Sequence, residues 1–386
     1  MSELPVRSQF DGPRSARPEE IKPIIDLVDT IHRTSRGNPP SIAADWPHVY
    51  NEANAQNVII IKDGDRFICS TGVWINDVRL GDVKLRVGGI NCVATVPDMR
   101  KHGLGKIIMD AAHQRIKDAG CHVGLLDTAI VNWYRRLGWE KSGCSISYRF
   151  TRTNIRLLPT LPPDTTMRAA GLPAEVPHSG TKAGDEAIES LIEIREADKL
   201  GGIRTPEILR VLLQARGRPK IVLAERGGRP VAYLLAGHRS IWEWGGPANV
   251  VAGLIRAWFE SCETPEVSTS LRNPDWSAAM PDEVSFTAPC WGHSLLSRLE
   301  QQRFPFSLGY LGMMIVLDPR GTLDAFGFGE IAVEQQGEQF VLSRSEEKCV
   351  VTQGQLATLF FGPERISDFA EDVFPLPFWQ WGIEHV

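Results

Sequence analysis

The stretch MRKHGLGKIIMD, residues 99–110, decides how this sequence is interpreted. It follows a β-rich run and begins an apolar pattern of period 3.6, so it marks the passage from a strand into a helix. Gly103 and Gly105 stand at this turn among basic neighbours. Backbone amides at the start of a helix have no partner within the helix, and the helix dipole makes that end positive. The stretch therefore predicts a phosphate-binding turn.

Two common phosphate-binding motifs do not fit this turn. A P-loop requires G-x-x-x-x-G-K-[ST], but Arg100 stands at the first glycine and Ile107 at the hydroxyl position. The dinucleotide motif G-x-G-x-x-G fails because Ile108 replaces its third glycine. The pattern that fits is R-x-x-G-x-G, formed by Arg100, Gly103 and Gly105. An ordinary strand-to-helix turn with solvated basic residues is the alternative.

The regions on both sides of the turn alternate between helical and strand patterns. Apolar residues at helical spacing predict a helix within residues 18–34. Two β-rich runs around Gly64 predict a hairpin, and strand patterns continue up to Pro97. The helix that follows should end at Gly120, and a further strand is expected within residues 122–128. This order indicates a mixed α/β unit.

The rest of the chain divides into two further segments. A run with three prolines, residues 157–166, predicts a linker. The second segment repeats the helix and hairpin order more loosely, with Thr205 as a helix N-cap and a hairpin turn at Gly227 and Gly228. The pattern changes again from about residue 317 into strands followed by helices. We expect three units, over residues 1–156, 157–316 and 317–386.

Composition excludes several classes of protein. A formal net charge of −5 and the lack of a Lys/Arg cluster argue against a nucleic-acid partner. No apolar run reaches the roughly 18 residues that span a bilayer. The first residues lack the apolar core of a signal peptide. We therefore expect a cytoplasmic protein that has neither a membrane nor nucleic acid as its partner.

The seven cysteines form no CxxC pair and are odd in number. They are expected to be scattered, reduced thiols, as in cytosolic proteins. Neither the cysteines nor His113 stand at metal-ligand spacing, so no metal site is expected.

The glycine turn and its surroundings resemble the GNAT superfamily of N-acetyltransferases. The resemblance is carried by VPDMRKHGLG, by YRRLGWE at residues 134–140 and by the order of helices and strands around them. It implies an α/β (α+β mixed) fold and acetyl-coenzyme A as cosubstrate. The whole layout resembles the Eis (enhanced intracellular survival) class: two tandem GNAT-type domains, the second degenerate, and a C-terminal sterol-carrier-like domain. That class implies a homo-oligomer, and a hexamer is one assembly it allows.

The resemblance also assigns the residues that hold the cofactor. The strand before the turn should part from its neighbour, so that the pantetheine arm pairs with its backbone. The implied contacts are Val93, Ala94 and Thr95 for the arm, and Arg100, Lys101, His102, Gly103, Leu104, Gly105 and Lys106 for the diphosphate. Asp127 stands where many relatives have asparagine.

Acetyl transfer to an amine needs an acid for the departing thiolate and a base for the amine. Tyr134 matches the tyrosine that is the general acid in Eis-like proteins, and a phenol with a pKa near 10 is protonated at neutral pH. The resemblance implies that the base is the main-chain carboxylate of the last residue, Val386. Glu384 and His385 compete with it, and His385 has the better intrinsic pKa.

We therefore expect an acetyl-CoA-dependent N-acetyltransferase. Its substrate would be a primary amine on a small molecule, a peptide or a lysine side chain, which attacks the thioester directly. The alternative is a lipid- or sterol-binding protein with a relic acetyltransferase fold. The aromatic-rich C-terminal sequence FPLPFWQWGIEHV, residues 374–386, is the feature that favours this alternative.

Overall fold

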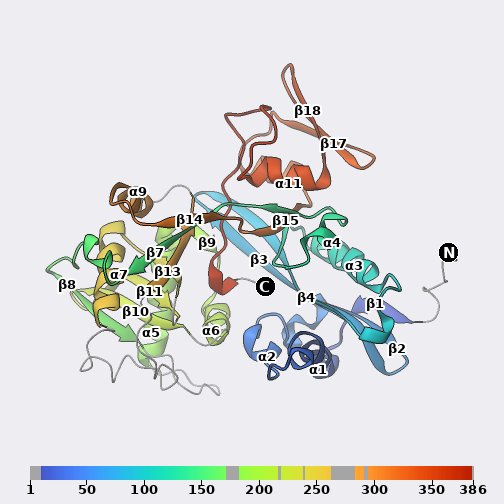
Figure 1. Cartoon of the computed structure of the whole chain (residues 1–386), viewed down its shortest axis with the longest axis horizontal. Helices are drawn as coiled ribbons and strands as arrows, with labels where there is room; N and C mark the ends of the chain where they lie inside the picture. Colours follow the sequence, from blue (N-terminus) through green and yellow to red (C-terminus); the bar gives the residue numbers. More distant parts are fainter. Residues whose placement is uncertain are drawn as a thin grey trace.

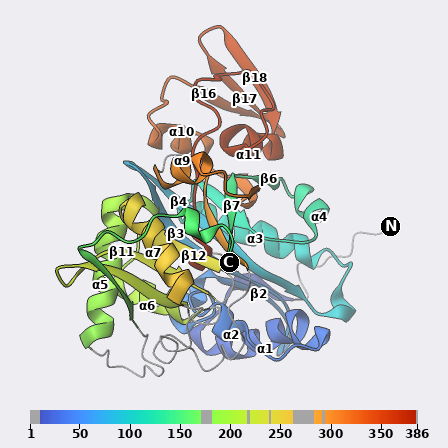
Figure 2. The same ribbon diagram turned by 60° about the vertical axis from the view of Figure 1, so that its left-hand side comes forward.

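A computed structural model describes residues 10–170, 182–215, 219–237, 240–261, 283–290 and 294–384. These residues form a mixed α/β fold with sheets of eight, seven and three strands, which confirms the predicted fold class. Figures 1 and 2 show the two large sheets side by side and the smallest sheet at one end of the molecule.

The first sheet is built around a long central hairpin. Its strand order is β1-β2-β3-β4-β5-β15-β6, and β9 also pairs with β3. The strands are β1 (Asp11–Ser15), β2 (Val58–Asp63), β3 (Arg66–Leu80), β4 (Val83–Thr95), β5 (Val123–Leu126), β6 (Glu140–Ser142), β9 (Leu200–Gly202) and β15 (Gly312–Val316). The predicted hairpin around Gly64 is the β2–β3 turn, where this glycine has φ +56°.

Helices cover both faces of this sheet. The helices are α1 (Ile21–His32), α2 (Ile42–Asp45), α3 (Leu104–Asp118) and α4 (Val131–Arg135). On β2, Val58 and Ile60 pack in the cluster that holds α1, whereas Ile59 and Ile61 pack in the cluster that holds α3. Because successive side chains of a strand point to opposite faces, α1 and α3 lie on opposite sides of the sheet.

The second sheet has the order β14-β7-β13-β12-β11-β10-β8. The strands are β7 (Ser145–Thr151), β8 (Thr165–Ala170), β10 (Lys220–Arg226), β11 (Arg229–Ala236), β12 (Ser240–Gly245), β13 (Glu283–Pro289) and β14 (Phe306–Gly309). The helices are α5 (Lys182–Asp198), α6 (Pro206–Gln214), α7 (Ala248–Ser261) and α9 (Ser294–Gln301). Thr205 caps α6 by accepting a hydrogen bond from the Ile208 amide, as predicted.

The third sheet, β16-β17-β18, lies with two helices in the C-terminal part of the chain. The elements are α10 (Pro319–Ala325), β16 (Ala332–Gln336), β17 (Gln339–Arg344), β18 (Glu347–Thr352) and α11 (Gln353–Phe361). Strands followed by a helix agree with the sequence pattern. The likeness of this unit to sterol-carrier proteins stays a prediction.

The two large sheets exchange strands. β7 precedes residue 156 but lies in the second sheet, between β14 and β13. β15 belongs to residues 157–316 but lies in the first sheet, between β5 and β6. The predicted units over residues 1–156, 157–316 and 317–386 stay a prediction as domains, and both large sheets contain strands from either side of the boundary at residue 156.

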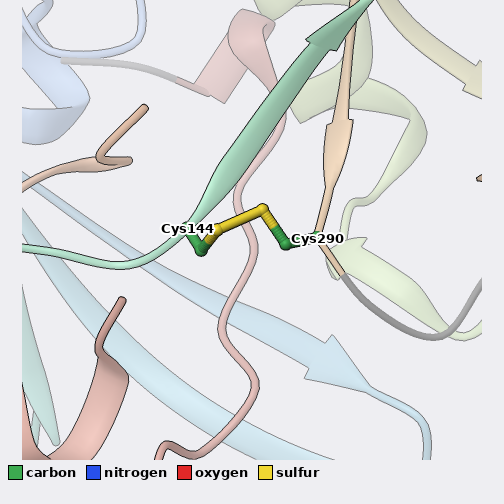
Figure 3. Close-up of a disulfide and its surroundings, with 2 residues drawn as sticks. All are labelled: Cys144 and Cys290. Atoms are coloured by element: carbon green, nitrogen blue, oxygen red, sulfur yellow. A yellow bond between two sulfur atoms is a disulfide. The ribbon is translucent and has the colours of Figure 1, made fainter. Parts of the chain in front are cut away.

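A disulfide joins Cys144 to Cys290 at the start of β7 and the end of β13 (Figure 3). The expectation that the cysteines are reduced is wrong for this pair. The two residues are 146 positions apart in sequence, but the antiparallel pairing of Ser145 with Pro289 brings them together. Cys69, Cys92, Cys121 and Cys349 are free thiols.

The C-terminal segment ends in a short helix, η7 (Gly382–Glu384), that lies between the two large sheets (Figure 1). Glu384 is 0% exposed, and the guanidinium of Arg204 pairs with it at 2.6 Å and with Glu243 at 2.8 Å. Arg195 completes the cluster by pairing with Glu243 at 2.9 Å. We call these four residues the buried charge cluster; its two positive and two negative side chains compensate one another.

Two glycines make room for the C-terminal segment. A Cβ at Gly201 would lie 2.2 Å from the Trp381 ring, and a Cβ at Gly202 would lie 1.7 Å from Glu384 Oε1. Both glycines belong to β9, which pairs with β3 of the first sheet. The end of the chain is therefore held by the same strand that joins the second segment to the first sheet.

Substituting Glu384 with alanine should strongly destabilise the protein. Arg204 would lose one of its two buried carboxylates, and removal of one partner from a buried ion pair typically costs about 3 to 5 kcal/mol. The free energy of unfolding in urea should fall by that amount. Glu207→Ala is the control, because the Glu207 side chain is 76% exposed. Equal unfolding midpoints for the two variants would contradict this account.

Candidate active site

The candidate site begins where β4 leaves β5. Parallel pairing between these strands runs from Val87 opposite Val123 to Gly89 opposite Leu125. β4 itself continues to Thr95. The last part of β4 therefore extends past its pairing with β5, as the resemblance to GNAT proteins implied. This leaves a strand edge to which an extended chain can pair.

A bulge distorts β4 at the same place. Gly72 of β3 faces Asn91, but the next paired residue of β3, Ser70, faces Ala94, so β4 carries an extra residue. Cys92 within the bulge has φ +47°. Ala94 is buried, whereas Val93 and Thr95 are half-buried. The bulge turns the backbone of β4 out of the regular ladder beside the unpaired edge.

The glycine turn follows β4 directly. Gly103 is the N-cap of α3 with φ +80°, and Lys101 also has a positive φ of 66°. The amides of Lys106 and Ile107 donate to the carbonyl of Gly103. Those of Leu104 and Gly105 find no acceptor among the residues that the structure describes. The start of α3 therefore presents donors for an anion.

The side chains of the turn are mostly open to solvent. Lys101, His102 and Gly103 are exposed, whereas the Leu104 side chain is buried and can offer only its amide. A Cβ at Gly105 would lie 3.2 Å from the Trp133 ring, so α4 packs closely on this glycine.

Two of the basic residues already have partners. Lys106 pairs with Asp110 at 2.7 Å, and both side chains are more than half exposed. Arg100 Nε donates to the Thr95 carbonyl at 3.2 Å, so this arginine links the turn to the end of β4.

Tyr134 comes to the site from α4. Its side chain is 7% exposed, and its ring meets that of Trp133 edge to face at 4.7 Å. Burial, with a smaller contribution from the nearby Cys92 thiol, raises the pKa of Tyr134 to about 12. Its hydroxyl has no hydrogen-bond partner among the described residues. A protonated phenol beside the β4 bulge is thus available to a bound molecule.

The predicted base is not placed by the structure. Val386 and His385 lie outside the described residues. Glu384, the third candidate, pairs with Arg204 and accepts a hydrogen bond from the Trp381 amide, so its carboxylate is occupied. Glu384 is therefore an anchor for the end of the chain rather than a base.

Three residues near the bulge had no motif to mark them in the sequence. His32 Nε2 lies 3.2 Å from the Val93 carbonyl oxygen. The Tyr50 hydroxyl donates to the Asn91 carbonyl at 3.4 Å, and burial raises the pKa of Tyr50 well above its usual value. Burial likewise raises the pKa of Cys92 to about 12, which makes its thiol a poor nucleophile at neutral pH.

A cavity of about 820 Å³ lies beside the site, between α4 and the C-terminal unit. Its lining includes the charged residues Lys106, Arg136, Glu338 and Glu364 together with apolar residues such as Phe340. Among the residues that the structure describes, no group of His, Cys, Asp or Glu side chains could hold a metal ion. None of the described helices is both long and apolar enough to cross a membrane.

The chain is similar over most of its length to several solved structures. A GCN5-related N-acetyltransferase from Anabaena variabilis gives a TM-score of 0.61 at 13% identity, over 91% of this chain and 89% of that one. A probable N-acyltransferase from Enterococcus faecalis gives 0.59 at 14% identity, over 88% and 84%. Eis1 from Mycobacterium abscessus gives 0.56 at 13% identity, over 91% and 90%. At these identities the likeness shows the fold.

A family model matches the part of the chain that contains the candidate site. No curated protein sequence matches the chain. Residues 13–142, however, match the model described as an acetyltransferase (GNAT) domain. This range contains the β4 bulge, the glycine turn and Tyr134. Residues 13–142 are thus similar to a GNAT acetyltransferase domain.

Proposed function

We propose that this protein is an acetyl-CoA-dependent N-acetyltransferase that acts on a primary amine. The observation that carries the proposal is the coincidence of three features within residues 13–142: the free edge of β4, the open amides at Gly103 and the protonated phenol of Tyr134. Acetyl-CoA is a thioester with a diphosphate at its other end, and it needs all three features. The amides anchor the diphosphate, the strand edge aligns the arm, and the phenol protonates the departing sulfur.

The cofactor would bind along the turn and the strand edge. The amides at the start of α3 and the cations of Arg100, Lys101 and Lys106 would hold the diphosphate, with His102 contributing its backbone amide. The backbone of Val93, Ala94 and Thr95 would align the pantetheine arm. Since Arg100 donates to the Thr95 carbonyl, binding would exchange that hydrogen bond for contacts to phosphate.

The reaction would then be a direct transfer. The amine nitrogen attacks the acetyl carbon, the C–S bond breaks, and Tyr134 gives its proton to the departing sulfur. The Val386 carboxylate stays a predicted base. The predicted acceptor is an amine on a small molecule, a peptide or a lysine side chain, and the predicted assembly is a homo-oligomer.

The alternative of an apolar-ligand protein gains no support from the C-terminal segment. Trp379 and Trp381 are 2% and 0% exposed, so most of the surface of both rings packs in the core. The charged cavity beside the C-terminal unit is also unsuited to a sterol.

Substituting Gly103 with alanine should weaken coenzyme A binding. A Cβ is disfavoured at φ +80°, so the turn would shift and its amides would turn from the diphosphate. We expect the dissociation constant from calorimetry to rise about tenfold, which equals about 1.4 kcal/mol. Gly120→Ala is the matched control: Gly120 follows the other end of α3 with φ +71° and equal space around it. If the wild-type protein binds no coenzyme A, the proposed function is wrong.

Substituting Tyr134 with phenylalanine should lower kcat and leave the KM for acetyl-CoA almost unchanged. Loss of a general acid costs roughly 100-fold or more. The measurement is thiol release from acetyl-CoA with spermidine, kanamycin and a lysine peptide as acceptors. Tyr148→Phe is the control, because Tyr148 is buried in the second sheet and its hydroxyl has no partner among the described residues. Equal kcat values for both variants would exclude Tyr134 as the acid.

The Tyr134 phenol should titrate near pH 12 instead of pH 10. Burial disfavours the phenolate, so the acid form persists throughout the physiological range. The difference in ultraviolet absorbance between the wild-type protein and Tyr134→Phe isolates this group. A phenolate signal that is complete at pH 10 would contradict the assigned environment.

A further inference from the structure

The β4 bulge is approached from two sides. Tyr134 packs in the cluster that holds α3, on one face of the first sheet. His32 is the last residue of α1, which lies on the opposite face. Its Nε2 atom is 3.2 Å from the Val93 carbonyl oxygen within the bulge. A titratable imidazole and a protonated phenol therefore flank the same distorted segment of β4 from opposite faces.

The contact with Val93 fixes how the imidazole is protonated. A carbonyl oxygen only accepts hydrogen bonds, so Nε2 must carry the hydrogen. In the neutral ring the lone pair is then on Nδ1. The side chain is half-buried, and Nδ1 has no partner among the described residues. His32 is thus held in the tautomer that leaves one nitrogen free to accept a proton.

The surroundings favour the neutral ring. Burial lowers the pKa of His32 most, the bond to Val93 opposes this effect, and the guanidinium groups of Arg36, Arg33 and Arg100 lower the pKa further. These cations lie on the segment after α1 and on the glycine turn. At pH 7 the imidazole is therefore unprotonated and ready to act as a base.

We propose that His32 is the general base of the acetyl transfer and accepts, at Nδ1, the proton that the acceptor amine loses. This inference rests on the proposed function. The nitrogen–carbon bond forms and the carbon–sulfur bond breaks, while one proton passes from the amine to His32 and another from Tyr134 to sulfur. Solvent then removes the first proton and returns the second, so both side chains are restored.

The test is the pH dependence of kcat for the wild-type protein and His32→Gln. Glutamine can still donate an N–H to Val93 but cannot act as a base. We expect kcat at pH 7 to fall about 100-fold, with an unchanged dissociation constant for coenzyme A. The wild-type kcat should fall at acid pH with a midpoint below 6.5, because the base must be neutral, and this acid limb should disappear in the variant. His122→Gln, on the segment before β5, is the matched control.

Deletion of Val386 separates this role from the predicted terminal carboxylate. His32 is not the base if the His32→Gln variant keeps the wild-type kcat and the decrease of kcat at acid pH, whereas the protein without Val386 loses both the activity and this pH dependence. A variant that binds coenzyme A normally but has lost kcat supports the proposal, because a misfolded protein would lose both. Absence of coenzyme A binding by the wild-type protein would instead overturn the proposed function itself, and the role of His32 with it.

Discussion

The site depends on one constraint on β4: this strand must stay paired with β3 while it leaves β5. The long β3–β4 hairpin satisfies the first condition, since pairing extends from Leu80 opposite Val83 to Cys69 opposite Thr95. The bulge at Cys92 and the early end of the β5 pairing satisfy the second. A strand supported on one side alone is rigid enough to align a ligand and still has free backbone groups for it.

The remainder of the molecule holds that hairpin in place. β7 comes from the first segment of the chain but is hydrogen-bonded in the second sheet, and β15 comes from the second segment but is hydrogen-bonded in the first sheet. These two strands therefore link the sheets. The disulfide and the buried charge cluster add links between distant parts of the chain. A buried cluster of this kind contributes little net free energy, since desolvation offsets most of its attraction. Its effect is to specify one position for the C-terminal segment, because any other would leave charges buried without partners.

The sequence was sufficient to predict the structural features that depend on residues close together in the chain. Four predicted features depend only on neighbouring residues, and the structure confirms each of them. They are the helical periodicity, the hairpin turn at Gly64, the helix cap at Thr205 and the turn into a helix at Gly103. Strand exchange, the disulfide and the position of His32 depend on residues that are far apart in sequence. His32 carried no signal because a histidine at the end of an amphipathic helix is ordinary until Val93 is seen beside it.

The second sheet contains a similar turn, and its contacts make it a poorer candidate for a diphosphate than the turn at Gly103. β12 and β13 are also parallel neighbours, and α7 also follows its strand after a glycine, Gly246. There the Gly246 amide donates to the Asp198 carboxylate at 2.8 Å. A fixed carboxylate occupies the donor and would repel a phosphate by its charge. At Gly103 no such carboxylate intervenes among the described residues, and the neighbouring side chains are cations. Of the two glycine turns, only the one at Gly246 therefore has a carboxylate bound to its glycine amide among the described residues, and the proposed diphosphate site is the other.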